Sequence, residues 1–250
     1  MGKILKFDYY NRYAGQNRRI HLYLPEGGSP DERYAVLYML DGQNLFYDSD
    51  ATFGTSMGLK DFIDLYWKKL IVVGIECAGR DYDRVREYVP YNIHSNIYGY
   101  VEGQGDATFR WITEELKPYI DSRFPTWPQR EATAIGGFSL GGMMALYGVL
   151  HYNHIFSKGV AISPAFRPAM EAFCHEILTG VFNFDTRIFF SWGSNELFDE
   201  SDLENRIRHL ECLAQEKGIT TYLLRNEGGN HNERSWRYEV RHWMRFIWEG

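Results

Sequence analysis

Apolar residues follow two different periods along this chain. Apolar runs of strand length alternate with stretches in which apolar residues recur every three or four positions, as on one face of a helix. This alternation begins after an opening pair of strands and continues to the C-terminus, which is typical of a mostly parallel sheet covered by helices. We therefore predict an α/β fold whose eight strands span residues 3–9, 18–24, 35–40, 70–76, 132–136, 159–163, 187–191 and 220–224.

The connections between these strands are of three kinds. The segment YAGQN joins the first two strands and is too short for a parallel connection, so it predicts an antiparallel N-terminal hairpin. Residues 59–66, 203–213 and 236–247 read as covering helices, and residues 107–121 as a helix that Pro118 kinks or ends early. Three longer stretches, each after a strand, do not fit this alternation: residues 41–56, 79–105 and 164–185. We expect these stretches to form the pocket.

Composition narrows the classes of protein to consider. With 250 residues the chain can form one large hydrophobic core, so we expect a single domain. A net charge of −6 without a Lys/Arg cluster argues against nucleic acid and anionic membrane surfaces as partners. Three widely spaced cysteines without a Cys-x-x-Cys pair indicate neither a disulfide framework nor a zinc site. Because no secretory leader or membrane-spanning apolar run is recognisable, we expect a cytoplasmic protein.

A candidate nucleophile lies in the segment Gly137-Phe138-Ser139-Leu140-Gly141. This segment follows a predicted strand and opens a helical run. Small residues two positions before and after Ser139 let strand and helix approach closely, so that the serine occupies a strained turn at the sheet edge. The alternative is a glycine-rich turn with an ordinary serine. A suitably placed base and acid elsewhere in the chain would favour the nucleophile.

A serine attacks only when a base takes its proton, and in this order of elements the base follows the last strand. His231 is so placed, after the strand at 220–224 and before the C-terminal helix. The other histidines lie in the opening ribbon or in predicted helices, except His94, which lies in a long loop before the serine. His151 and His154 lack a third ligand at a suitable spacing, so we expect no metal and no cofactor.

The carboxylate that orients the base should follow the next-to-last strand. Glu196 is the first carboxylate beyond the strand at 187–191, and we favour it over Asp199, which lies a turn further on. An oxyanion hole also needs two backbone N–H donors. Leu140 can supply the first and Gln43 the second, although the segment around Gln43 also reads as a simple glycine turn.

Assembled, these segments resemble the putative-esterase (esterase D-like) family within the α/β-hydrolases. The resemblance covers nearly the whole chain and rests on VLYMLDGQN, RVREYVP, the stretch from GDATFRWITEELKPYIDSRF to GGFSLGGMMALYG, SWGSNE and GGNHNERSW. It implies the α/β-hydrolase fold, with helices on both faces of the sheet. Carried over by position, it also implies a triad and two oxyanion donors, at Ser139, Glu196, His231, Gln43 and Leu140.

Two departures qualify this resemblance. Many relatives carry Asp where Glu196 stands, and the usual His-Gly of the oxyanion loop is Asp41-Gly42 here. The segment RVREYVP also matches the family, and we interpret an Arg–Glu pair within it as scaffolding beneath the pocket, with substrate contact as the alternative role. Aromatic residues near these loops are candidate pocket walls or equally core packing: Tyr88, Tyr91 and Trp192.

The function that these features predict is hydrolysis of a small-molecule carboxylic ester through an acyl-enzyme. The stretch at 164–185 is too short for a large lid domain, so we expect an open pocket that prefers short-chain or aromatic acyl groups. An acyltransferase or thioesterase would use the same triad. A binding module of the same fold, without activity, is a third interpretation.

Overall fold

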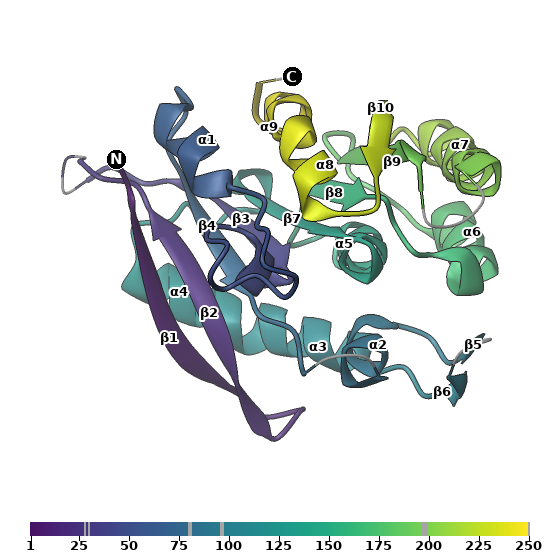
Figure 1. The fold of residues 1–250 in the computed structure, drawn as a ribbon, viewed down its shortest axis with the longest axis horizontal. Helices are drawn as coiled ribbons and strands as arrows, with labels where there is room; N and C mark the ends of the chain where they lie inside the picture. The colour runs from purple at the N-terminus through teal and green to yellow at the C-terminus, as the bar shows by residue number, and fades with distance from the viewer. Residues whose placement is uncertain (28, 30, 80–81, 96–97, 197–199, 250) are drawn as a thin grey trace.

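The central feature of the computed structural model is an eight-stranded sheet (Figure 1). The structure describes residues 1–27, 29, 31–79, 82–95, 98–196 and 200–249. The first two strands form an antiparallel hairpin at one edge, β2 pairs antiparallel with β4, and the remaining neighbours are parallel. In sheet order the strands are β1 (Lys3–Asn11), β2 (Gln16–Leu24), β4 (Leu70–Ile75), β3 (Ala35–Leu40), β7 (Thr133–Phe138), β8 (Lys158–Ile162), β9 (Arg187–Asn195) and β10 (Thr220–Asn230). The mostly parallel eight-stranded sheet and the N-terminal hairpin predicted from the sequence are confirmed.

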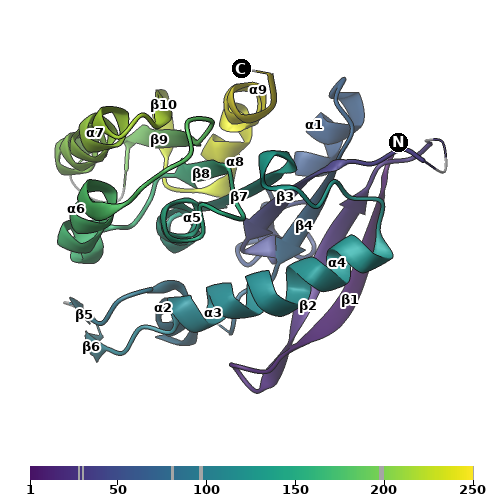
Figure 2. The ribbon, with the colours of Figure 1, turned by 180° about the vertical axis from the view of Figure 1, so that it is seen from behind.

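Helices cover both faces of this sheet (Figures 1 and 2). One face packs against α1 (Leu59–Leu65), α8 (Glu233–Trp236) and α9 (Val240–Glu249). The other face packs against α2 (Tyr82–Tyr88), α3 (Gly105–Trp111), α4 (Lys117–Arg123), α5 (Leu140–His151), α6 (Met170–Thr179) and α7 (Glu200–Glu216). The result is a three-layer arrangement with an apolar cluster on each side of the sheet.

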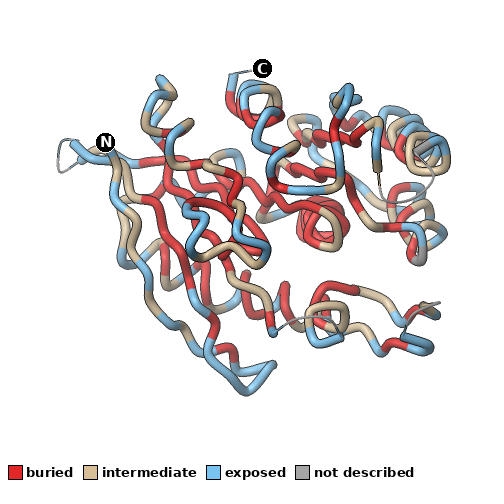
Figure 3. Tube along the Cα trace, in the orientation of Figure 1, coloured by how far each residue is buried: buried red, intermediate tan, exposed pale blue. Residues whose placement is uncertain are grey.

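The middle strands are buried along their whole length, as the red core of Figure 3 shows. Successive side chains of a strand point to opposite faces of the sheet. Along β3, Val36 and Tyr38 therefore join the apolar cluster on one face, and Leu37 and Met39 join the cluster on the other. This is why the central strands read as unbroken apolar runs rather than as alternating patterns.

The long helical segment from Gly105 to Arg123 contains one irregular turn. Residues Ile112–Leu116 form a π-helical turn between α3 and α4, and Pro118 lies in the first turn of α4. Proline lacks an N–H donor and its ring crowds the carbonyl four residues earlier, so a widened turn just before it relieves the clash. The irregularity expected at Pro118 therefore takes the form of a π-turn within a continuous helical run (Figure 2).

The structure differs from the sequence-based prediction mainly in lengths and in two long stretches. Strands β9 and β10 run further than predicted, to Asn195 and Asn230. The stretch at 79–105 contains α2 and a small separate hairpin of β5 (Ile93–Ser95) and β6 (Gly99–Val101). Much of the stretch at 164–185 is helix α6, whose Phe173 and Ile177 are fully buried.

Candidate active site

The predicted site residues follow neighbouring parallel strands at the carboxyl edge of the sheet. Asp41 follows β3, Ser139 follows β7, Glu196 follows β9 and His231 follows β10. A further polar residue, Ser163, follows β8 in the middle of this row. Since parallel strands end at the same edge, residues separated by up to 190 positions in the sequence, from Asp41 to His231, come together there.

Ser139 occupies the sharp turn between β7 and α5. Its backbone has φ 58° and ψ −124°, a conformation that side chains other than glycine rarely adopt. Hydrogen bonds hold the turn in place: Ser139 N donates to Ile162 O over 2.9 Å, and Met143 N donates to Ser139 O over 3.1 Å. A Cβ atom at Gly137 would clash with the backbone of Gly141, so this glycine permits the close approach of strand and helix. The strained turn predicted from the motif is present.

His231 and Glu196 form a short contact. His231 Nδ1 lies 2.5 Å from Glu196 Oε2, and the two side chains are 15% and 3% exposed. Burial by itself would raise the pKa of Glu196, but hydrogen bonds from His231, Gly193 and Ser163 together hold it below its ordinary value. Glu196 is therefore an ionised acceptor, and His231 Nδ1 must carry the proton. This tautomer leaves Nε2 free to act as a base.

Ser163 binds the other oxygen of the Glu196 carboxylate. Its hydroxyl donates to Glu196 Oε1 over 2.7 Å, and the backbone N–H of Gly193 donates to the same oxygen over 2.8 Å. Trp236 Nε1 donates to Ser163 Oγ over 3.0 Å. Ser163 also has a positive φ of 42°, a backbone conformation that residues other than glycine rarely adopt. Sequence reasoning missed Ser163, and its place directly after β8 was the available signal.

Trp236 connects the neighbourhoods of the serine and the histidine. Its ring stacks on Phe138, the residue before Ser139, with ring centroids 4.8 Å apart. It also packs edge-on against the imidazole of His231 at 5.1 Å. The indole thus limits the positions that His231 can adopt, while its N–H serves the carboxylate network.

The segment after β3 forms a tight turn that begins in the left-handed conformation. Asp41 has φ 57° and ψ 48°, and the 3-10 turn Gly42–Asn44 follows it. A Cβ at Gly42 would clash with the backbone of Gly74, so glycine is required there. Gln43 and Leu140 lie in the first turns of their helices, where backbone N–H groups have no acceptor within the helix. Both residues therefore have a backbone N–H group without an acceptor in the helix, which is the kind of donor that an oxyanion hole needs.

Asp41 is held by a buried ion pair. Arg84 Nε and Nη2 donate to the two Asp41 carboxylate oxygens over 2.7 Å each, and Asp41 N donates to the hydroxyl of Tyr88 over 3.0 Å. The Asp41 charge raises the pKa of Arg84 against the opposing effect of burial. The charged residues of RVREYVP that form ion pairs here do so with residues outside the segment, Arg84 with Asp41 and Glu87 with Arg18. Arg18 Nη2 lies 2.7 Å from the carboxylate of Glu87, because α2 presents Arg84 and Glu87 to different neighbours.

The three candidate pocket walls lie mostly in the interior. Tyr88 and Trp192 are each 1% exposed, so neither ring lines an open pocket in this structure. Tyr91 is half-buried and packs edge-on against Tyr147 and Phe173. An aromatic residue in a loop has the same sequence pattern whether it lines a pocket or fills the core. The alternative acid, Asp199, lies outside the described residues.

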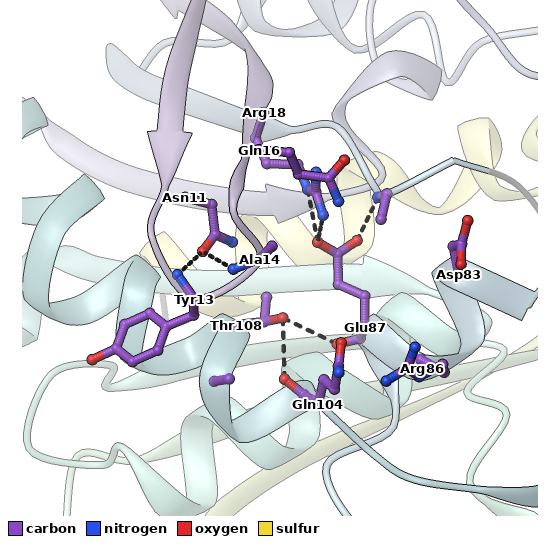
Figure 4. Close-up of a pocket in the computed structure, with 12 residues that line it drawn as sticks. Asn11, Tyr13, Ala14, Gln16, Arg18, Asp83, Arg86, Glu87, Gln104 and Thr108 are labelled. Atoms are coloured by element: carbon purple, nitrogen blue, oxygen red, sulfur yellow. Dashed lines mark hydrogen bonds and ion pairs between the residues drawn. The ribbon is translucent and has the colours of Figure 1, made fainter.

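A polar cavity of about 350 Å³ opens beside the hairpin turn between β1 and β2 (Figure 4). Residues that line it include Asn11, Arg18, Glu87, Gln104 and Thr108. Helix α2 turns Glu87 toward this cavity and Arg84 toward Asp41. The cavity and the candidate site therefore lie on different faces of the same helix.

In the part of the chain that the structure describes, no group of three or more His, Cys, Asp or Glu side chains is arranged to hold a metal ion. Across the same residues, none of the helices combines the length and the apolar character needed to cross a membrane.

Comparison with known proteins shows the family. The family model described as "Putative esterase" matches residues 12–243. The chain is 25% identical over 220 residues to protein YbbA of Bacillus subtilis, covering 84% of this chain and 83% of that protein. It is 26% identical over 156 residues to Esterase MT1326 of Mycobacterium tuberculosis, covering 60% of this chain and 30% of that protein.

A similar solved structure is the IroE-like serine hydrolase from Shewanella oneidensis, with a TM-score of 0.78 and 20% identity over 97% of this chain and 79% of that chain. This likeness shows the fold, and the family match shows the class of reaction. The chain therefore belongs to the putative esterase family and is an ester-hydrolysing enzyme of the α/β-hydrolase fold.

Proposed function

We propose that this protein hydrolyses carboxylic esters through an acyl-enzyme, with Ser139 as nucleophile, His231 as base and Glu196 as the orienting acid. The observation that carries the proposal is the contact of 2.5 Å between His231 Nδ1 and Glu196, at the same sheet edge as the strained turn of Ser139. A buried, ionised carboxylate on Nδ1 fixes the tautomer that a general base requires.

In the proposed first step, Ser139 Oγ attacks the ester carbonyl carbon while His231 Nε2 takes the hydroxyl proton. The carbonyl oxygen becomes an oxyanion, which accepts hydrogen bonds from the backbone N–H groups of Gln43 and Leu140. Collapse of this intermediate breaks the bond to the alcohol, and His231 returns its proton to the leaving oxygen. Water, deprotonated by His231, then attacks the acyl-enzyme, and the acid is released as Ser139 regains its proton.

Short-chain and aromatic acyl groups are the proposed substrates. Helix α6, in the stretch after β8, is packed into the core through Phe173 and Ile177 rather than raised as a lid over Ser139. A site without a large lid domain offers little apolar surface to a long acyl chain, whereas a short or planar acyl group needs less. Esters of acetate, butyrate and aromatic acids such as cinnamate should therefore be cleaved faster than a long-chain ester.

Acyl transfer to an alcohol or thiol, and thioester hydrolysis, would share every step up to the acyl-enzyme. Hydrolysis is favoured here because the family match is to esterases. Product analysis with water and a competing alcohol separates these reactions, since a transferase yields the new ester as the main product.

Replacement of the proposed nucleophile tests the proposal. Ser139→Ala should lower turnover of a p-nitrophenyl ester by roughly 10⁶-fold and abolish labelling by a fluorophosphonate probe. Ser122→Ala, which changes an exposed serine on α4, is the matched control and should keep both properties. A Ser139→Ala variant with even a tenth of wild-type turnover would rule out the assignment. A wild-type protein that the probe does not label would favour a binding module.

A further inference from the structure

A buried hydrogen bond joins two loops at the carboxyl edge of the sheet. Asn44 Nδ2, in the turn that contains Gln43, donates to Glu233 Oε1 over 2.9 Å. Glu233 is the first residue of α8 and lies two positions after His231. Asn44 and Glu233 are 5% and 6% exposed. The contact thus connects the segment after β3 with the segment after β10, on either side of Ser139 in the order of the sheet.

The other polar groups of Asn44 hold its own loop together. Its side-chain oxygen accepts from Thr52 N over 2.8 Å, and its carbonyl oxygen accepts from Met57 N over 2.7 Å. Its N–H donates to Asp41 O over 2.9 Å. The other hydrogen bonds of Asn44 described above all lie within residues 41–57. Glu233 therefore links this loop to a segment outside it.

This contact does not depend on the charge of Glu233. Burial raises the pKa of its carboxyl group against a hydrogen bond from its own backbone N–H, and the nearby charge of Asp41 raises it further, while His231 and Arg84 oppose the shift. A carboxyl oxygen accepts a hydrogen bond in the ionised and in the neutral form. Asn44 therefore has an acceptor at every pH at which the protein is folded.

We propose that Glu233 is a positioning residue, which holds the loop of the oxyanion donor Gln43 in register with the loop of the base His231. The inference rests on the proposed function, because it concerns the same site. Oxyanion donors act only at about 2.7–3.1 Å from the developing charge. A displacement of about 1 Å costs on the order of 100-fold in rate, so a link that fixes both loops relative to Ser139 bears directly on turnover.

The experiment removes each partner of the link and then both. Glu233→Ala should lower kcat by roughly 10- to 100-fold and change KM little, because the displaced donor acts in the transition state rather than on bound substrate. Asn44→Ala should lower kcat at least as much, because it breaks the same link and also removes the acceptor of Thr52 N. The double variant should be no slower than the slower single variant, since both changes break one link. Glu233→Gln should keep kcat within about threefold of wild type, because its amide oxygen still accepts from Asn44.

A second measurement separates positioning from general stability. The affinity of an aryl boronic acid, whose adduct with the serine is tetrahedral, should fall in Glu233→Ala by the same factor as kcat/KM. Asp121→Ala is the matched control, because this half-buried carboxylate accepts from Lys117 and Thr126 near the opposite edge of the sheet. It should lower the melting temperature without lowering kcat.

A folded Glu233→Ala variant with at least half of wild-type kcat would overturn the inference. The inference would also be overturned if the fold-losses in kcat of the two single variants multiplied in the double variant. If Glu233→Ala does not fold, Asn44→Ala decides by the same criterion. Failure of the proposed function is seen separately: an active Ser139→Ala variant refutes the triad, whereas an inactive one together with an unaffected Glu233→Ala variant refutes only the role of Glu233.

Discussion

A change at Glu239 should alter the pH dependence of stability in a way that the structure specifies. Glu239 lies in the 3-10 turn Arg237–Glu239 between α8 and α9 and is 1% exposed. Ser191 Oγ donates to its Oε2 over 2.5 Å and Asn226 Nδ2 donates to its Oε1 over 2.9 Å. Burial raises the pKa of Glu239 to about 7, against these two hydrogen bonds and with added repulsion from Glu196.

The sign and the size of the effect follow from this shift. In the unfolded chain the pKa of Glu239 is near 4.5, so between pH 4.5 and about 7 the folded protein binds the proton more tightly than the unfolded chain. The stabilisation is fully present below pH 4.5 and is lost as the pH rises through about 7. Since one pKa unit corresponds to about 1.4 kcal/mol, the loss amounts to roughly 3 kcal/mol in the free energy of unfolding.

Glu239→Gln removes this titration and keeps the shape of the side chain. Its amide oxygen can accept from Asn226, and its amide N–H can donate to the Ser191 hydroxyl oxygen. The free energy of unfolding of the variant, measured relative to wild type, should therefore rise by roughly 3 kcal/mol from pH 5 to pH 8. This corresponds to a rise of about 6–12 °C in its melting temperature relative to wild type.

Urea unfolding and thermal melts at half-unit steps of pH measure this difference. Glu171→Gln is the matched control, because it removes one exposed carboxylate on α6 by the same substitution. A flat difference for Glu239→Gln across the same range would refute the reasoning, because Glu239 would then titrate alike in the folded and unfolded states.

Three further changes test the site. Glu196→Gln should lower turnover by about 10⁴-fold without unfolding the protein, by favouring the wrong imidazole tautomer, whereas Asp199→Asn should be nearly silent. The reverse pattern in a p-nitrophenyl ester assay would reassign the acid. Ser163→Ala removes a donor to Glu196 and the acceptor of a buried indole, so kcat should fall by roughly tenfold and stability by about 1–3 kcal/mol, and unchanged kinetics would deny it a supporting role. Arg84→Met leaves the Asp41 carboxylate buried and unpaired, so the free energy of unfolding measured with urea should fall by about 3–5 kcal/mol. A fall below about 1 kcal/mol would show that the pair is dispensable.

Much of the fold could be predicted because local patterns and the final environment agree. The run AVLYML is apolar at every position and forms β3, which is buried on both faces. The segment GFSLG combines a strand, glycines and a helical run, and it forms the strained turn at Ser139. That Glu196 and His231 meet could be predicted from their order relative to strands, since parallel strands bring their carboxyl ends to one edge.

Tertiary packing decided which polar residues meet and which aromatic residues reach the surface. Nothing local to Ser163, Asn44 or Glu233 indicates their partners, because hydrogen bonds of 2.7 and 2.9 Å join segments 33 and 189 positions apart. Arg84 has Glu87 nearby on its own helix but binds Asp41, which follows the end of β3. Sequence periodicity reports which face of an element is apolar, whereas pairing between elements depends on distances that exist only once the helices have packed onto the sheet.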